Sequence, residues 1–225
     1  MRENWKICIR TQNLLLLPYR RSFVPIYHTW MSDPALLEAT SSERLTLDEE
    51  YTAQRGWVDD PEKCTFIIFD RLLHENVAPR GLKGEIHVGD GCNTAGMCGD
   101  VNLFLLPAFA VEDYFAGVPC EGGCAEVMVM IADVLFRRRG YASEAVRGLL
   151  TYGVRELNLK RFVVKISENN IASLSLFQDK LGFVEVKRVP AFSEVHLAWE
   201  ASELEGGEVD LMACDAPLKE EEGLE

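Results

Sequence analysis

The chain of 225 residues lacks any run of about 18 or more apolar residues, the length that a membrane-spanning helix requires. Its leucine-rich stretch from Asn13 to Pro18 is too short for the apolar core of a signal peptide. Its seven cysteines are odd in number and scattered, which argues against a disulfide framework. We therefore expect a soluble protein with reduced thiols, no contact with membranes, and a cytoplasmic location, although a nuclear one also fits.

The sequence also lacks a C-x2-C pair, the usual anchor of a zinc site. Cys120 and Cys124, with Cys92, Cys98 and His87 before them, are the one set from which a metal site could be imagined. We interpret these residues as ordinary loop and core side chains, and we expect no metal.

Positive charge is scarce, because 23 Lys and Arg stand against 36 Asp and Glu, for a net charge of -13. Nucleic-acid binding is therefore not expected, since phosphate contacts need a basic face. Residues 203–225 hold nine acidic residues and one lysine, a charge of -8, which leaves -5 for the rest. This segment is poor in aromatic residues, so we expect a disordered acidic tail that serves solubility, with partner binding as the alternative.

Hydrophobic residues make up 48% of the chain, which is enough to form one apolar core. We expect a single domain over residues 1–202, interrupted by long loops at about 71–96 and 107–123. The patterns predict helices at 23–31, at 46–56 behind a Thr46/Glu49 capping box, at 142–157 and at 170–182. They predict strands at 13–19, 64–70, 97–106, 125–133, 161–167, 183–189 and 194–200. The class is α/β or mixed α+β, on a largely antiparallel sheet.

Arginines gather in "RRRGYASEA", residues Arg137 to Ala145, between a predicted strand and a predicted helix. Unpaired amides and the dipole at a helix start attract anions, and the arginines add charged donors. Gly140 and Ala142 are small enough for a phosphate to approach the backbone. The turn indicates a phosphate or pyrophosphate site, or else a solvated basic turn, and neither a P-loop nor a dinucleotide motif fits it.

This turn carries the first of two motifs that follow each other along the sequence. Arg137, Gly140 and Ala142 form R-x-x-G-x-A, and residues 170–183 form N-x-x-S-x-x-x-F-x-x-x-L-G-F. Together they resemble the GCN5-related N-acetyltransferase (GNAT) superfamily. The segments "LLLLPYRRSFVPIYHTWM", "LTLDEEYTAQRGWVDDPEKCTFIIFD" and "GDVNLF" are similar to the N-acetyltransferase 9-like family, an α/β-tubulin N-acetyltransferase branch. The resemblance covers about residues 13–200.

The resemblance implies a GNAT fold, in which a mixed, mostly antiparallel sheet is splayed at a central β-bulge and flanked by helices. Acetyl-CoA would lie as co-substrate between the strands at 125–133 and 161–167. The implied cofactor-binding residues are Met130, Ile131 and Ala132 for the pantetheine arm, Arg137, Arg138, Arg139, Gly140, Tyr141, Ala142 and Ser143 for the pyrophosphate, and Asn170, Ser173 and Phe177 on the far side. As alternatives, Met130 and Ile131 suit the core, and Asn170 suits a helix cap.

The implied reaction, attack of an amine on a thioester, needs a proton acceptor. Glu126 is our candidate, as the one carboxylate in an apolar strand, with an exposed strand-end charge as the alternative. Lys165 stands where some relatives have a glutamate base, which makes Glu126, or else Asp100, more necessary. Phe177 replaces the tyrosine that many relatives use as general acid. Tyr141 and Tyr152 are possible substitutes, although a thiol with a pKa near 8.5 leaves tolerably without one.

The sequence thus predicts an acetyl-CoA-dependent N-acetyltransferase acting on a protein amine, an N-terminal α-amine in the first place. Tubulin is the acceptor that the family suggests, but an acidic enzyme gains no electrostatic steering toward an acidic partner. Two alternatives stay open: acetylation of a small amine such as a polyamine, and a catalytically silent module that binds acyl-CoA. Oligomeric state is left open.

Overall fold

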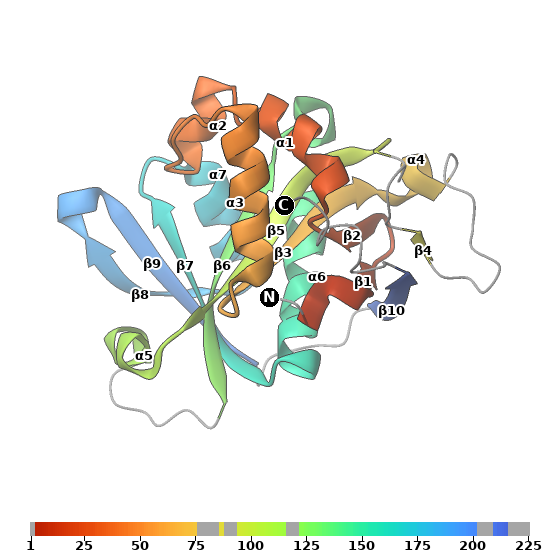
Figure 1. Cartoon of the computed structure of the whole chain (residues 1–225). Helices are drawn as coiled ribbons and strands as arrows, with labels where there is room; N and C mark the ends of the chain where they lie inside the picture. Colours follow the sequence, from red (N-terminus) through yellow and green to blue (C-terminus); the bar gives the residue numbers. More distant parts are fainter. Residues whose placement is uncertain (1–2, 76–85, 88–93, 116–121, 202–208, 216–225) are drawn as a thin grey trace.

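The computed structural model describes residues 3–75, 86–87, 94–115, 122–201 and 209–215. They form one ten-stranded sheet with helices on both faces (Figure 1). Within these ranges, no helix combines the length and apolar character needed to cross a membrane.

The strands are short at the two ends of the sheet and long in its middle. They are β1 (Ile7–Arg10), β2 (Leu14–Pro18), β3 (Lys63–Asp70), β4 (Ile86–His87), β5 (Met97–Leu106), β6 (Gly123–Ile131), β7 (Leu159–Ser167), β8 (Val184–Val189), β9 (Glu194–Glu200) and β10 (Asp210–Asp215). The helices are α1 (Val24–Trp30), α2 (Pro34–Ala39), α3 (Leu47–Asp59), α4 (Arg71–Glu75), α5 (Ala108–Phe115), α6 (Tyr141–Glu156) and α7 (Ile171–Ser175), which continues as a π-helical turn (Leu176–Lys180).

The strand order is β4-β10-β1-β2-β3-β5-β6-β7-β9-β8. Neighbouring strands run antiparallel except in two pairs, β6 with β7 and β4 with β10. The long α6 connects β6 to β7, as a parallel pair requires a crossover. The predicted mixed, mostly antiparallel sheet is confirmed.

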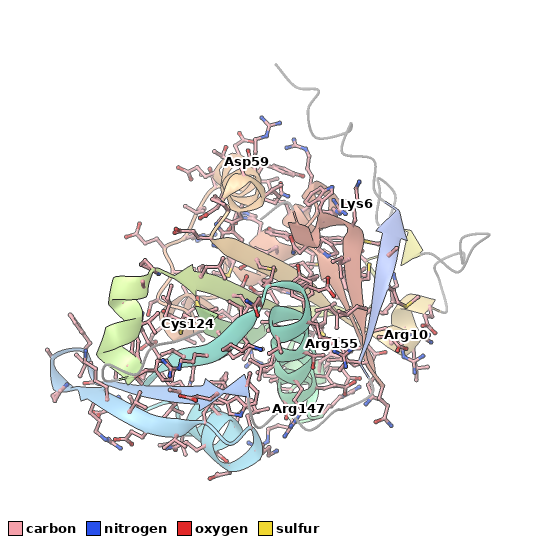
Figure 2. The ribbon with its side chains drawn as sticks, turned by 90° about the horizontal axis from the view of Figure 1, so that it is seen from below. Lys6, Arg10, Asp59, Cys124, Arg147 and Arg155 are labelled. Carbon is pink, nitrogen blue, oxygen red and sulfur yellow. The ribbon has the colours of Figure 1, made fainter. Side chains whose placement is uncertain are left out.

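The alternation of side chains along each strand divides the interior into two apolar cores. One core lies between the sheet and α6, and the other lies beneath α1, α2 and α3. Figure 2 shows these two layers edge-on, with Asp59 at the end of α3 on one side of the sheet and Arg147 and Arg155 of α6 on the other. The Thr46/Glu49 capping box that starts α3 is formed as predicted.

The two central strands separate partway along their length. Residues of β6 and β7 pair from Gly123 with Leu159 to Glu126 with Val163, and the described ladder ends there. Beyond this point β6 stays with β5 while β7 stays with β9, so the two halves of the sheet diverge (Figure 1). The predicted splay is confirmed, and the register shift lies at the base of the ladder, between Gly123 and Cys124.

The expectation of a wholly disordered tail is wrong for residues 210–215. They form β10, which pairs with β1 from Ile7 opposite Ala213 to Arg10 opposite Asp210. Cys214 is 5% exposed, so the apolar residues of this acidic segment have a core to enter. The domain therefore extends to at least residue 215, beyond the predicted boundary at 202, while 203–208 and 216–225 lie outside the described residues.

The sequence patterns also missed β1, α2 and the short elements inside the two predicted loops. The loop at 71–96 begins with α4 and contains β4, and the loop at 107–123 contains α5. Residues 76–85, 88–93 and 116–121 of these loops lie outside the described residues.

Candidate active site

The turn before α6 places its glycine in the left-handed region. Gly140 is the N-cap of α6 with φ of 85°, and a Cβ built on it would meet no atom within 4 Å. The protein itself therefore requires glycine here for its backbone conformation, because L side chains rarely adopt positive φ. The space beside Gly140 is open, at the end of a helix of 16 residues whose first amides have no partner in the helix. Both features suit an anion cradle.

The three arginines of the turn do different things. Nε and Nη2 of Arg137 donate hydrogen bonds of 2.9 Å to the carbonyls of Ile131 and Ala132. This guanidinium closes the end of β6, and the contact with the pyrophosphate that was predicted for Arg137 stays a prediction. Arg138 and Arg139 are exposed, and Arg138 has φ of 62°. Their predicted contacts with the pyrophosphate, and those of the neighbouring amides, stay predictions.

Tyr141 anchors the start of α6 to the sheet. Its hydroxyl donates a hydrogen bond of 2.5 Å to Oδ2 of Asp70 at the end of β3. Burial, with the adjacent Asp70 carboxylate, raises the pKa of Tyr141 to about 12, although Arg139 opposes the shift. A phenol held in this way is a weak acid, so the structure disfavours Tyr141 as a general acid. Tyr152 is fully buried against Phe66, within the core under α6.

The acidic residue in the first turn of α6 is turned away to the β1–β2 connection. The carboxylate of Glu144 accepts hydrogen bonds from the hydroxyl of Thr11 and from the backbone and side-chain nitrogens of Asn13, at 2.6 to 2.9 Å. Its charge is therefore met by three donors of the protein. Ala142 and Ser143, which flank this contact on the helix, are partly buried.

The end of β6 is paired on one side only among the described residues. Met130 stands opposite Asp100 on β5, and the amide of Ala132 donates to the carbonyl of Cys98 at 2.9 Å. The side chains of Met130 and Ala132 are buried, and that of Ile131 is partly buried. The β7-facing backbone edge of residues 127–131 has the extended form that a pantetheine amide needs, and this contact stays a prediction.

The second motif forms a capped helix with an irregular turn. Oδ1 of Asn170 accepts a hydrogen bond of 3.1 Å from the amide of Ser173, so Asn170 caps α7. The π-helical turn follows, and single π turns recur at functional sites. Phe177 is 2% exposed and packs edge-on against Phe183 at 5.1 Å between ring centroids. The expected cofactor contacts of Asn170, Ser173 and Phe177 stay predictions.

Glu126, the predicted proton acceptor, has a charged partner. Nζ of Lys165 lies 2.6 Å from Oε2 of Glu126, at the last paired position between β6 and β7. Burial alone would lower the pKa of Lys165, but the hydrogen bond and charge of Glu126 raise it above its usual value. Glu126 is therefore not the isolated carboxylate that the sequence indicated. Its role as base stays a prediction.

Asp100, the other carboxylate that the sequence left open, is deeply buried on β5. It is 4% exposed, and Nδ2 of Asn102 donates a hydrogen bond of 2.7 Å to its Oδ2. Burial raises the pKa of Asp100 to about 6, against the opposing effects of Asn102 and of Lys63. Burial likewise lowers the pKa of Lys63 to about 8. A carboxyl that titrates near neutrality is what proton transfer at physiological pH needs.

The described cysteines are buried core residues. They are Cys8, Cys64, Cys98, Cys124 and Cys214, and burial raises the pKa of the Cys98 thiol to about 12. Within the described ranges no three His, Cys, Asp or Glu side chains are grouped as metal ligands. Cys92 and Cys120 lie outside those ranges.

The sheet opens beside the glycine-led start of α6, as the resemblance to N-acetyltransferases implies, and comparison with known proteins agrees. The family model "Acetyltransferase (GNAT) domain" matches residues 13–184. The chain is 34% identical to an N-acetyltransferase 9-like protein of Nematostella vectensis, over 97% of this chain and 98% of the relative. It is 39% identical to the alpha/beta-tubulin-N-acetyltransferase 9 of Drosophila melanogaster, over 88% of this chain and 87% of the relative.

Among solved structures, the spermidine N-acetyltransferase from Vibrio cholerae in complex with CoA and spermine superposes with a TM-score of 0.63. It is 16% identical and covers 86% of this chain and 98% of its own, so the likeness concerns the fold. The chain belongs to the GNAT superfamily and, within it, to the N-acetyltransferase 9-like family. It is an N-acetyltransferase that transfers an acetyl group to an amine, and the family implies acetyl-CoA as the donor.

Proposed function

We propose that the acceptor is a protein and that the acetylated group is its N-terminal α-amine. The observation that carries this proposal is the exposed edge of the sheet beside the open wedge. Strand β8 ends the sheet and is exposed along almost its whole length. An edge strand presents unpaired backbone groups that an extended peptide can join.

The edge also carries apolar side chains that a polyamine would not use. Val184 and Phe192 of the β8–β9 hairpin are 66% and 74% exposed, and Val186 is 40% exposed. β8 lies two strands from β7, and strands are about 4.8 Å apart, so this edge lies roughly 10 Å from the wedge. A peptide whose first residue enters the wedge spans that distance in about three extended residues.

The face of the wedge that carries Glu126 holds two carboxylates and one ammonium group. Glu126 is paired with Lys165, and the carboxylate of Glu194 lies 3.1 Å from Nε2 of His196, which stands opposite Lys165. Glu194 therefore adds a second negative charge that one lysine does not offset, and negative charge favours the approach of a protonated amine. Relatives named as tubulin acetyltransferases make tubulin the first acceptor to try, and the acidic composition of this chain offers it no steering.

Mass spectrometry of protein N-termini tests the proposal. We expect a defined set of N-termini to lose acetylation when the gene is removed. The set should regain it with the wild-type chain, but not with Gly140→Val, which disturbs the turn before α6 while the protein leaves room for the side chain. If no N-terminus changes while a small amine loses its acetylation, the acceptor is a small amine. If neither changes, the chain is a silent acyl-CoA-binding module.

A further inference from the structure

Buried polar side chains lie on the sheet face beneath α1 and α3, one strand in from the open edge of β6. Asp100 on β5 stands opposite Met130 on β6, and Asn102 stands opposite Met128. Cross-strand neighbours have Cβ atoms roughly 4.5 to 5.5 Å apart. Met128 is 36% exposed and lies beyond the last pairing of β6 with β7. The carboxyl of Asp100 is therefore about one side chain away from the place where the strands open.

This face holds more unpaired polar atoms than a buried face tolerates. Each buried donor or acceptor without a partner costs about 1 to 3 kcal/mol, and buried water normally supplies the missing bonds. Within the described part of the chain, five buried atoms here have no hydrogen-bond partner. They are Oδ1 of Asp100, Oδ1 of Asn102, Oγ1 of Thr65, Oη of Tyr19 and Nε1 of Trp5.

These atoms run from the open edge of β6 to the surface. Thr65 stands opposite Asn102 on the neighbouring strand β3. Three of the five atoms belong to residues that line a small surface hollow. The lining residues are Asn4, Trp5, Tyr19, Trp57, Val58 and Thr65. The hollow, the hydroxyls and the carboxyl thus form a polar path through an otherwise apolar layer.

The alternative proton acceptor, Glu126, already forms an ion pair with Lys165. To take a proton it would have to give up Lys165, whose Nζ lies 2.6 Å away. The free oxygen of Asp100 has no such competitor among the described residues, since Asn102 occupies the other one. Nζ of Lys63, whose charge acts on Asp100, lies 3.2 Å from the ring centroid of Trp57.

We propose that Asp100 accepts the proton of the acceptor amine through water and releases it through further waters hydrogen-bonded to Asn102, Thr65 and Tyr19, which lead to the surface hollow. The ion pair of Glu126 and Lys165 joins β6 to β7 at the base of the wedge. This inference rests on the transfer of acetyl to an amine at the open edge.

The step balances as follows in bonds and protons. The ammonium group gives one proton to Oδ1 of Asp100, and its nitrogen attacks the thioester carbon. A C–N bond forms, the C–S bond breaks, and sulfur leaves with the electron pair as a thiolate. The second proton of the nitrogen ends on the thiolate or in solvent, while the proton of Asp100 leaves through the hollow.

Several titratable groups lie around Asp100, and of these Lys63 is the one whose charge shifts the pKa of Asp100. They are Lys63 on β3, Tyr19 after β2, Tyr27 on α1, and Glu50 on α3, which faces the same tyrosines. Burial raises the pKa of both tyrosines, and the nearby carboxylates raise it further, so they stay neutral across the physiological range. Asp100 itself titrates at about 6. The rate of acetyl transfer should therefore fall as the pH drops through about 6.

The test compares Asp100→Asn, Glu126→Gln and a control, Glu50→Gln, which removes another buried carboxyl of the same layer. Each variant receives acetyl-CoA with a mixture of free-N-terminus pentapeptides that differ in their first residue, and separately with spermidine. We expect Asp100→Asn to lower kcat at least 100-fold and to abolish the acid limb of the pH profile. The control should keep both kcat and the limb.

The outcomes separate this inference from the proposed function. If the wild type acetylates spermidine but not the peptides, the proposal of a protein acceptor is wrong. The role of Asp100 is then still tested, with spermidine as the acceptor. An acid limb retained in Asp100→Asn, or lost in Glu126→Gln alone, overturns the role of Asp100. If the wild type acetylates neither probe, both proposals fall.

The water path has a separate test. Thr65→Val removes one hydroxyl without changing the size of the side chain. We expect kcat to fall several-fold and its solvent deuterium isotope effect to increase, with KM unchanged. Unchanged kcat and isotope effect in Thr65→Val would overturn the path. Thr151→Val serves as the control, because the Thr151 hydroxyl only bonds the carbonyl of Arg147 on α6.

Discussion

The two faces of β6 are built for different purposes. Val127, Val129 and Ile131 face the core under α6, while Glu126 and Met128 lie on the other face, toward α1 and α3. On β5 the same division places Val101 and Leu103 in the core and Asp100 and Asn102 opposite. One alternating pattern of side chains therefore serves two purposes. The face toward α6 stabilises the sheet, and the opposite face carries the polar groups of the proposed reaction. Four experiments test this division, from the largest expected effect to the smallest.

The apolar face should carry the stability. Leu149 on α6 is fully buried in this core, so Leu149→Ala should lower the free energy of unfolding by about 2 to 5 kcal/mol. Leu135→Ala, at a side chain 70% exposed, should change it by less than about 0.5 kcal/mol. Urea unfolding of both variants provides the measurement. Equal effects would show that the face under α6 is not the main source of stability.

The ionised form of Asp100, on the polar face, should lower the stability of the folded protein. The pKa of Asp100 is raised to about 6 in the folded protein, against about 3.9 in an unfolded chain. The folded state therefore binds a proton that the unfolded state has lost between pH 4 and 6. Stability should fall by about 2 to 3 kcal/mol as the pH rises through that window, and then level off. Asp100→Asn should lack this fall, as urea unfolding at several pH values will show.

Other groups also change stability over that window, so the control is the difference between wild type and variant. Asp100→Asn should gain stability relative to wild type as the pH rises from 4 to 7. A difference that stays constant with pH would mean that the carboxyl is not strained by burial.

The turn before α6 should affect binding more than folding. Gly140→Ala adds a Cβ at positive φ, which costs roughly 1 kcal/mol of stability, but it meets no atom of the protein. Gly182→Ala is a matched strain control, because Gly182 has φ of 75° and equally open space. We expect a similar loss of stability in both. Calorimetry with acetyl-CoA should show a loss of affinity of tenfold or more in Gly140→Val, and wild-type affinity there would refute the cradle.

The ion pair at the base of the wedge should contribute least. The side chains of Glu126 and Lys165 are 17% and 35% exposed, and such pairs contribute about 0 to 1 kcal/mol. Glu126→Gln and Lys165→Met should each lower stability within that range, and less at high salt. A double-mutant cycle by urea unfolding measures their coupling. Coupling well above 1 kcal/mol would make the pair a main support of the wedge.

Prediction from sequence succeeded where the signal was local. The apolar run typical of a strand located β5 at 97–106, and the capping box located the start of α3. It failed for β1 and β10, because strands of four and six residues become stable only when they pair. These two strands pair with each other, although they lie about 200 residues apart in the sequence. The acidic tail composition concealed β10 for the same reason. A weak cue was present in "DLMAC", an apolar run inside the tail.

In the candidate site, too, the sequence predicted local features and missed those that depend on distant residues. Gly140 and its flanking residues could be found from sequence, but the reason for the glycine and the use of Arg137 could not. The glycine serves a left-handed N-cap, and Arg137 closes the end of β6, both of which depend on backbone geometry. The partner of Glu126 was hidden because Lys165 lies 39 residues away on a strand that meets β6 only through the crossover.

The sequence by itself determined the elements around the site, the two motifs and the family, because periodicity, caps and motif spacing act within a few turns or strands of the chain. Only the tertiary structure decided which carboxylate forms an ion pair and which is buried with one oxygen unbonded. Charge and burial depend on residues brought together from distant segments: Asp100 is enclosed by Lys63 and Tyr27 from other elements, while Glu126 meets Lys165. The proton affinity of a carboxyl is set by that environment, and no local pattern of the chain encodes it.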